Sequence, residues 1–199
     1  MTRILHVETS TKMCSVALSE NGKLIAYKNI EAEGFVHSEK LNLLIEEVCK
    51  GSKVAYDKLS AISVSGGPGS YTGLRIGVST AKGLCYALNL PLIAIDSLEC
   101  LAQWGKINHP DFQGLFCAMI DARRMEVFSA IYDSYLVQIK PISADIVDEG
   151  SYSEYENEIM LLGDGAPKLM ELWKDREGLV FSNLIADARG QVHRAFELF

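Results

Sequence analysis

The first half of the chain alternates short apolar runs with helical patterns, which predicts a sheet with helices packed on it. The apolar runs at 4–8, 14–19 and 24–30 are typical of strands, and Asn21-Gly22 between the last two predicts a hairpin. Apolar side chains then recur every three to four positions over 41–48, which indicates one face of a helix. The chain therefore begins with three strands followed by a helix.

The rest of the first half continues this alternation. Apolar runs at 59–64 and 92–95 predict strands on either side of a second helical pattern at 74–88, which Pro91 ends. The predicted order is strand, strand, strand, helix, strand, helix, strand. Strands that alternate with helices are typical of α/β proteins.

The second half repeats this order less regularly. Its pattern predicts strands at 115–120, 126–132, 136–139, 160–162 and 179–181. It also predicts a helix that follows Gly165 through Leu169 to Trp173, and a terminal helix from Ile185 to Phe199. A sheet that starts with a hairpin and continues with crossover helices, occurring twice, predicts two ribonuclease-H-like lobes. We expect the lobes at 1–105 and 106–199, with Asn108-His109-Pro110-Asp111 as the connector.

Composition and charge exclude several classes of protein. The 199 residues are 48% hydrophobic and 23% charged, which is ordinary for a globular protein. No apolar run is long enough to cross a membrane, and the first residues lead directly into a strand without a signal peptide. The net charge of −7 argues against an autonomous nucleic-acid binder but allows a subunit whose partner holds the nucleic acid.

Cysteine and histidine spacing gives no metal site. The five cysteines include no Cys-x-x-Cys pair, and the four histidines show no metal-ligand spacing. The cysteines are widely spaced and lie in apolar segments: Cys14, Cys49, Cys85, Cys100 and Cys117. We expect reduced, mostly buried thiols in a cytoplasmic protein that has no membrane contact and binds no metal.

The most distinctive motif is the glycine-rich run Ser65–Gly77, which follows a predicted strand and opens a predicted helix. This arrangement can aim backbone N–H groups at an anion, with the helix dipole behind them. A tight turn at a helix start, with no ligand, fits the same pattern. The spacing matches neither the Walker loop nor the Rossmann fingerprint.

Three other turns carry polar residues after strands. Glu8-Thr9-Ser10-Thr11 can hold a phosphate or a metal-bound water, or it is simply a hydroxyl-rich turn, and Gly163-Asp164-Gly165 is a second possible phosphate loop. Asp121 can pair with Arg123 and Arg124 in a turn salt bridge, or with a ligand. The candidate nucleotide or phosphate site comprises Glu8, Thr9, Ser10, Gly67, Gly69, Ser70, Gly163 and Gly165.

Glycines at a four-residue spacing, Gly69, Gly73 and Gly77, form a smooth strip on the second helix. Such a strip lets another backbone approach closely, either in a partner subunit or in the chain's own sheet. Together with the apolar face of the preceding helix it predicts a subunit contact, which pairs two copies as a homodimer when no other partner is present. The expected interface residues are Leu41, Leu44, Val48, Gly73, Gly77 and Ala81.

Four segments resemble the TsaB (YeaZ) family of bacterial proteins: 4–11, 14–18, 67–77 and 120–128. The resemblance implies two ribonuclease-H-like lobes of the actin/hexokinase/Hsp70-like superfamily. It also implies a part in making N6-threonylcarbamoyladenosine next to the anticodon of tRNAs that read ANN codons. In this family the chain is the non-catalytic partner of a TsaD-like transferase, with a TsaE-like ATPase as the third component. The chain itself requires no cofactor, and it meets tRNA only through the complex.

The sequence also departs from the family and its catalytic paralogue. The paralogue carries a metal-binding His-x-x-x-His pair, and the corresponding positions here are Ser97 and Leu101. Leucine cannot ligate a metal, so both a transferase and an M22-type metallopeptidase are disfavoured. Glu8 stands where the family more often has Asp, and family members usually continue to an aromatic-rich segment beyond Phe199. A phosphotransferase-like enzyme using Glu8 and the glycine loop remains the alternative, with nucleotide binding open.

Overall fold

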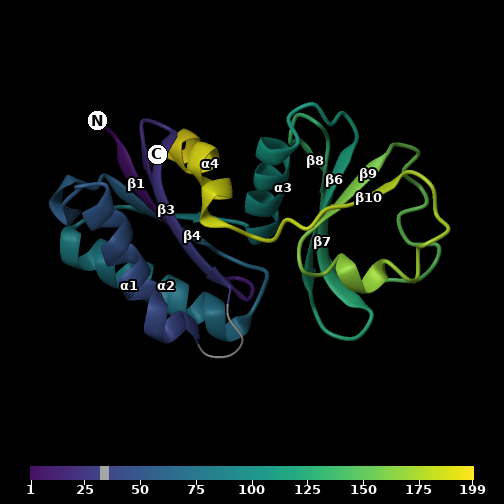
Figure 1. Ribbon diagram of the computed structural model, residues 1–199, viewed down its shortest axis with the longest axis horizontal. Coiled ribbons are helices and arrows are strands. Elements are labelled where there is room, and N and C mark those ends of the chain that lie inside the picture. The colour runs from purple at the N-terminus through teal and green to yellow at the C-terminus, as the bar shows by residue number, and fades with distance from the viewer. Residues whose placement is uncertain (32–35) are drawn as a thin grey trace. The chain divides into compact units, whose positions relative to one another are not determined.

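The computed structural model describes residues 1–31 and 36–199, and they form two compact units (Figure 1). The first unit consists of residues 1–100 and 186–199, and the second of residues 101–185. Each unit contains one five-stranded sheet.

The sheet of the first unit has the order β3-β2-β1-β4-β5. Its strands are β1 (Arg3–Glu8), β2 (Met13–Glu20), β3 (Lys23–Glu31), β4 (Ala61–Ser65) and β5 (Leu92–Ile95). β1, β2 and β3 pair antiparallel in sequence, whereas β4 pairs parallel with both β1 and β5. The left-handed residue Asn21 (φ 50°) and Gly22 (φ 75°) make the predicted turn between β2 and β3.

Helices cover both faces of this sheet. Figure 1 shows α1 (Val36–Gly51) and α2 (Tyr71–Leu88) on one face and α4 (Val192–Leu198) on the other. A 3₁₀ turn, η3 (Ala188–Gln191), leads into α4, and another, η1 (Tyr56–Lys58), precedes β4. The face under α1 and α2 forms a continuous apolar core.

The central strand β1 divides its side chains between the two faces. Leu5 and Val7 belong to the apolar core under α1 and α2. Successive side chains of a strand point to opposite faces, so Ile4, His6 and Glu8 point to the face that α4 covers. All five are fully buried. The second face therefore carries buried polar groups that require partners.

The sheet of the second unit has the order β10-β9-β6-β7-β8. Its strands are β6 (Leu115–Asp121), β7 (Glu126–Tyr132), β8 (Gln138–Ile146), β9 (Ile159–Leu162) and β10 (Leu179–Phe181). The first three again pair antiparallel in sequence, and β9 pairs parallel with β6 and β10. The second sheet thus repeats the strand order of the first, which confirms the predicted repetition of a hairpin-led α/β unit.

The structure corrects the predicted boundary and several elements. The division of the chain falls inside α3 (Ser97–Asn108), a helix the pattern did not predict, and not at the expected connector after Asn108. Residues 186–199, expected in the second lobe, belong to the first unit. The predicted helix up to Trp173 is only the 3₁₀ turn η2 (Pro167–Leu169), and the third strand of the second half lies at 138–146 instead of 136–139. No helix of the described residues is long and apolar enough to cross a membrane.

Candidate functional site

The glycine-rich loop is fixed by the turn that ends β1. The N–H of Ser70 donates to the Ser10 carbonyl at 2.6 Å, and Ser70 Oγ caps α2 by accepting from the N–H of Gly73 at 3.2 Å. Gly69 has φ 154°, and a Cβ at this position would overlap the Ser10 carbonyl oxygen. The close approach of the two backbones therefore requires glycine at this position.

The other end of the loop is tied to β5 and α3. The N–H of Gly66 donates to the Ile95 carbonyl at 2.8 Å, and the Gly67 carbonyl accepts from the N–H of Ser97 at 2.8 Å. Gly67 has φ 109°, in the region that favours glycine. Several polar backbone groups of the loop are thus used within the first unit.

Glu8 is the fully buried carboxyl group at the centre of the predicted site. Its Oε1 accepts from the N–H of Ser10 at 2.7 Å, and its Oε2 accepts from the hydroxyl of Ser65. Burial raises the pKa of Glu8, and the hydrogen bonds from Ser10 and Ser65 partly oppose that rise. The residues predicted here from the first lobe do come together, with Glu8, Ser10, Gly69 and Ser70 in one neighbourhood.

The glycine strip of α2 faces the chain's own β1 turn, which corrects the predicted interface. A Cβ at Gly73 would overlap the Thr9 carbonyl, and a Cβ at Gly77 would overlap Thr9 Oγ1. The Thr9 hydroxyl donates to the Gly73 carbonyl at 2.8 Å and is fully buried. The small residues let α2 pack against β1, so they are unavailable to a partner subunit.

The remaining predicted interface residues are also internal. Leu41, Leu44 and Val48 of α1 and Ala81 of α2 are all buried in the first core. The helical repeat correctly marked an apolar face, but the sheet of the same unit covers that face. A partner that docks on α1 and α2 must therefore use their opposite, exposed surface.

A buried hydrogen-bond network that the sequence analysis missed crosses the second face of the first sheet. His6 lies between two hydroxyls, with Nδ1 2.7 Å from Ser63 Oγ and Nε2 2.8 Å from Ser19 Oγ. Burial lowers the pKa of His6 to about 3, so the imidazole is neutral at physiological pH. Ser63 Oγ donates to Gln191 Oε1 at 2.7 Å, and Gln191 Nε2 donates to Ser65 Oγ at 3.1 Å. The network thereby connects His6 to the hydroxyl that binds Glu8.

The segment before α4 closes this polar face. Gln191 Nε2 also donates to the Val7 carbonyl at 2.8 Å, and the N–H of Ala188 donates to Ser15 Oγ at 2.7 Å. Asn29 Nδ2 donates to Asp187 Oδ2 at 3.0 Å. Polar residues at every second position of β1, β2 and β4 were the available sequence signal for this surface. Its partner comes from a segment more than a hundred residues away, which no local pattern reveals.

Gly163 and Gly165 belong to the second unit, where they permit close packing beside β6. A Cβ at Gly163 (φ 100°) would overlap the Met119 carbonyl, and the N–H of Gly165 donates to that carbonyl at 3.3 Å. Asp164 Oδ1 accepts from the N–H of Asp121 at 3.1 Å. The two glycines thus have an evident packing role within their unit.

The turn between β6 and β7 contains a different ion pair from the expected one. Asp121 pairs with Lys168 at 2.5 Å, and its Oδ1 also accepts from the N–H of Arg123 at 3.0 Å. The side chains of Arg123 and Arg124, which we expected to pair with Asp121, take part in no ion pair within residues 1–31 and 36–199.

A second polar cluster lies between β7 and β8. Tyr152 Oη donates to Asp145 Oδ2 at 2.6 Å, and Lys140 pairs with the same carboxylate oxygen at 2.8 Å. Burial acts to raise the pKa of Asp145, but hydrogen bonds led by that from Lys140 prevail and lower it to about 2. Ser129 is buried and bonded to Asp145, Lys140 and Tyr152. Every member has a partner, which is typical of a structural network that fixes the register of two strands.

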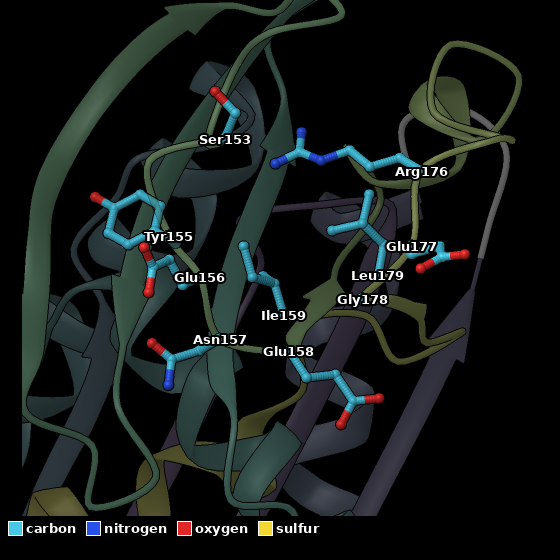
Figure 2. A pocket seen from close by; sticks show the side chains of 10 residues that line it. All are labelled: Ser153, Tyr155, Glu156, Asn157, Glu158, Ile159, Arg176, Glu177, Gly178 and Leu179. Atoms are coloured by element: carbon cyan, nitrogen blue, oxygen red, sulfur yellow. The ribbon is translucent and has the colours of Figure 1, made fainter.

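A shallow recess of about 510 Å³ lies beside β9 and β10 in the second unit (Figure 2). Its lining carries Glu156, Glu158 and Glu177 around one cation, Arg176. Arg176 donates to the Ser151 carbonyl at 2.6 Å and lies 5.3 Å from the ring centre of Trp173. The cation of the recess is therefore engaged in holding the unit together.

The two positions that correspond to the paralogue's histidine pair are fully buried in α3. The residues at these positions are Ser97 and Leu101, and neither side chain is accessible to solvent. Over the described part of the chain, no group of three or more His, Cys, Asp or Glu side chains is placed to hold a metal ion. Neither residue offers the imidazole or thiolate donors that a transition metal prefers.

The two units share one strand order, each led by a hairpin and completed by parallel strands. A family model described as tRNA N6-adenosine threonylcarbamoyltransferase, TsaD, matches residues 34–188. The chain belongs to this TsaD family.

Within this family the chain is similar to TsaB proteins. It is 36% identical over 141 residues to the tRNA threonylcarbamoyladenosine biosynthesis protein TsaB of Bacillus subtilis, covering 69% of this chain and 59% of that protein. It is 34% identical over 130 residues to the TsaB of Escherichia coli, covering 65% of this chain and 54% of that protein. The chain thus spans little more than half the length of the curated relatives it matches.

Solved structures share the fold. YeaZ from Pseudomonas aeruginosa superimposes with a TM-score of 0.86 at 24% identity, covering all of this chain and 92% of that one. An inorganic polyphosphate/ATP-glucomannokinase from Arthrobacter sp. matches with a TM-score of 0.54 at 12% identity, covering 100% and 98% of the two chains. These likenesses concern the fold alone.

Proposed function

We propose that this chain is a non-catalytic scaffold or activator subunit of the complex that makes N6-threonylcarbamoyladenosine next to the anticodon of ANN-decoding tRNAs. The observation that carries the proposal is the similarity of 33–36% identity to three proteins named tRNA threonylcarbamoyladenosine biosynthesis protein TsaB. Its direct partner is a TsaD-type transferase, and a TsaE-type ATPase is the third component.

The chemistry of α3 supports a non-catalytic role. At the positions that correspond to the paralogue's histidines, Ser97 offers one hydroxyl and Leu101 offers no donor atom. Both side chains are fully buried. A transferase that works through a metal held at this helix needs ligands that these residues do not provide.

The exposed surface of α1 and α2 is the partner surface that best fits the proposal. Leu43 of α1 is 48% exposed, and Tyr86 of α2 is 92% exposed. Gly83 precedes Tyr86 by three positions in α2, and an added Cβ at Gly83 would meet open space. Glycine inside a helix destabilises it relative to alanine, so an exposed one suggests a close approach by another chain. Tyrosine is enriched at the centres of protein interfaces.

The same surface accounts for the remaining partners. Without the transferase, two copies of the chain use it to form a homodimer. The net charge of −7 disfavours capture of tRNA by this chain alone, because phosphate neutralisation by Lys and Arg supplies most non-specific affinity. We therefore infer that tRNA is captured through the assembled complex.

The test is reconstitution with the TsaD-type and TsaE-type proteins of the same organism. Modified adenosine in unmodified tRNA is quantified by nucleoside mass spectrometry, with and without this chain. We expect co-purification with the TsaD-type protein, and modification only when both are present. The chain alone should neither modify tRNA nor turn over ATP.

A matched control is Lys53→Gln, an exposed change away from the proposed partner surface. It should restore modification as well as the wild-type chain does. Full modification in the absence of this chain, or modification by this chain alone, would contradict the proposed role.

A further inference from the structure

The tip of the hairpin between β6 and β7 has an unusual backbone for its residues. Arg123 has φ 70° and Arg124 has φ 43°, so two successive non-glycine residues are left-handed. The turn is closed by hydrogen bonds from the N–H of Ala122 to the Glu126 carbonyl and from the N–H of Glu126 to the Arg123 carbonyl. Gly and Asn adopt the left-handed region most readily, because it is sterically disfavoured for residues with a long side chain. The backbone therefore does not explain the choice of arginine.

Ion pairing does not explain the two arginine side chains either. Arg123 and Arg124 are exposed, and no ion pair in residues 1–31 and 36–199 includes them. The adjacent carboxylate of Asp121 is engaged by Lys168 and by the N–H of Arg123. Two neighbouring guanidinium groups thus stand unneutralised on a chain whose net charge is −7.

We infer that this tip, Arg123-Arg124, contacts the phosphodiester backbone of tRNA within the assembled complex, an inference that rests on the proposed function. Guanidinium groups bind phosphate oxygens in a bidentate manner. An exposed turn suits the backbone of a large polyanion better than a free nucleotide, because small ligands bind in concave sites. Contacts to phosphate position a nucleic acid without reading its sequence.

The inference is compatible with weak tRNA binding by the isolated chain. Two phosphate contacts on an acidic chain add little affinity alone but orient a tRNA that the complex already holds. The exposed Met125 follows directly and leaves the tip accessible.

The test uses the double variant Arg123→Asn/Arg124→Gly, which installs two residues that adopt the left-handed region readily. The hairpin keeps its conformation, so thermal stability should be equal to or above that of the wild type. In the reconstituted complex, the KM for tRNA should rise roughly five- to twentyfold. The slope of log affinity for tRNA against log salt concentration should fall in magnitude by about 1.5.

The matched control is Lys23→Gln/Lys53→Asn, which also removes two exposed positive charges. It also changes a left-handed residue, since Lys53 has φ 56°. This control should leave the KM for tRNA and the salt slope unchanged. Assembly with the TsaD-type protein in the absence of tRNA should be the same for both variants and the wild type.

Three outcomes overturn the inference. An unchanged KM and salt slope in the hairpin variant show that the tip does not touch tRNA. Loss of assembly without tRNA assigns the tip to a protein partner instead. An equal effect of the lysine control shows a general charge effect. If modification does not depend on this chain at all, the proposed function fails, whereas direct tRNA binding by the mixed proteins still tests the tip.

Discussion

Two glycines of helix α2, Gly77 and Gly83, differ in the space that surrounds them. At Gly77 an added Cβ would overlap Thr9 Oγ1, whereas at Gly83 it would meet open space. Glycine is disfavoured in helices because it loses more backbone freedom on folding than other residues do. At Gly77 the close packing of α2 on the β1 turn offsets that cost, whereas no described residue lies near a Cβ at Gly83 to do so.

The surroundings of Gly77 and Gly83 predict that Gly→Ala changes the free energy of unfolding in opposite directions at the two positions. Gly83→Ala should raise the free energy of unfolding by about 0.5–1 kcal/mol, the usual helix-propensity gain. Gly77→Ala should lower it by about 1–3 kcal/mol, because the methyl group forces Thr9 or the helix to move. Urea denaturation of both variants measures the two values. An unchanged free energy of unfolding in Gly77→Ala would show that α2 packs less tightly on Thr9 than described.

The ionisation of Glu8 is also decided by its immediate surroundings. Burial raises the pKa of this carboxyl group above the ordinary value of 4.5. Below that value the group is protonated in both the folded and the unfolded chain. As the pH rises, the unfolded chain loses this proton first, so the folded protein binds more protons and its stability falls with pH.

Glu8→Gln should therefore stabilise the protein increasingly above pH 4.5. The amide keeps an acceptor for the N–H of Ser10 but cannot become charged. Denaturation at a series of pH values should show a stability difference between variant and wild type that is larger at pH 8 than at pH 4. Parallel pH profiles would mean that Glu8 has no raised pKa.

At the scale of elements, the segment leading into α4 completes the first unit. β1, β2 and β4 present buried hydroxyls, an imidazole and a carboxyl group on one face, and Gln191 bonds Ser63, Ser65 and the Val7 carbonyl. A buried polar group without a partner costs about 1–3 kcal/mol. The segment therefore stabilises the sheet mainly by satisfying polar groups, in contrast to the apolar packing of α1 and α2.

Gln191→Ala should destabilise the protein by about 2–4 kcal/mol, because it leaves several of these groups unpaired at once. A control on the same segment is Glu197→Ala, whose ion pairs with His193 and Arg194 lie at the surface. Loss of such exposed pairs should cost less than about 1 kcal/mol. Thermal denaturation followed by circular dichroism compares the two, and equal effects would show that Gln191 does not hold the polar face together.

At the scale of the whole molecule, partner binding depends on surfaces that the fold leaves open. The apolar face of α1 and the glycine strip of α2 are used inside the first unit. The proposed partner surface is the opposite side of the two helices, around Leu43, Gly83 and Tyr86. Leu43 and Tyr86 are exposed there, and an added Cβ at Gly83 would meet open space.

Gly83→Arg should leave the chain folded and abolish both homodimer formation and binding of the TsaD-type protein. Its long charged side chain occupies the space that a closely packed partner needs. The control is Gly150→Arg, the same substitution at an exposed glycine of the second unit, where an added Cβ would make only an ordinary contact with Asp148. Analytical ultracentrifugation and titration with the partner measure both effects. Undiminished partner affinity in Gly83→Arg would place the interface elsewhere.

Much of the architecture followed from local patterns. Strand alternation, the Asn21-Gly22 turn and the helical repeats of α1 and α2 report interactions between residues close in sequence. For the same reason the order of the strands along the chain could be anticipated in both halves. The helix α3 was missed, and the division between the two units falls inside it.

The sequence by itself determined the five strands and the first two helices of the first unit, the two-lobed class and the resemblance to the TsaB family. Only the tertiary structure decided which neighbour each face meets. Gly73 and Gly77 face Thr9 and not a partner, and Asp121 pairs with Lys168 and not with the guanidinium of Arg123. Gln191 binds the Val7 carbonyl of a strand more than a hundred residues away. A periodic pattern specifies that a face is apolar, small or polar, but the partner of that face depends on long-range packing, which no local pattern encodes.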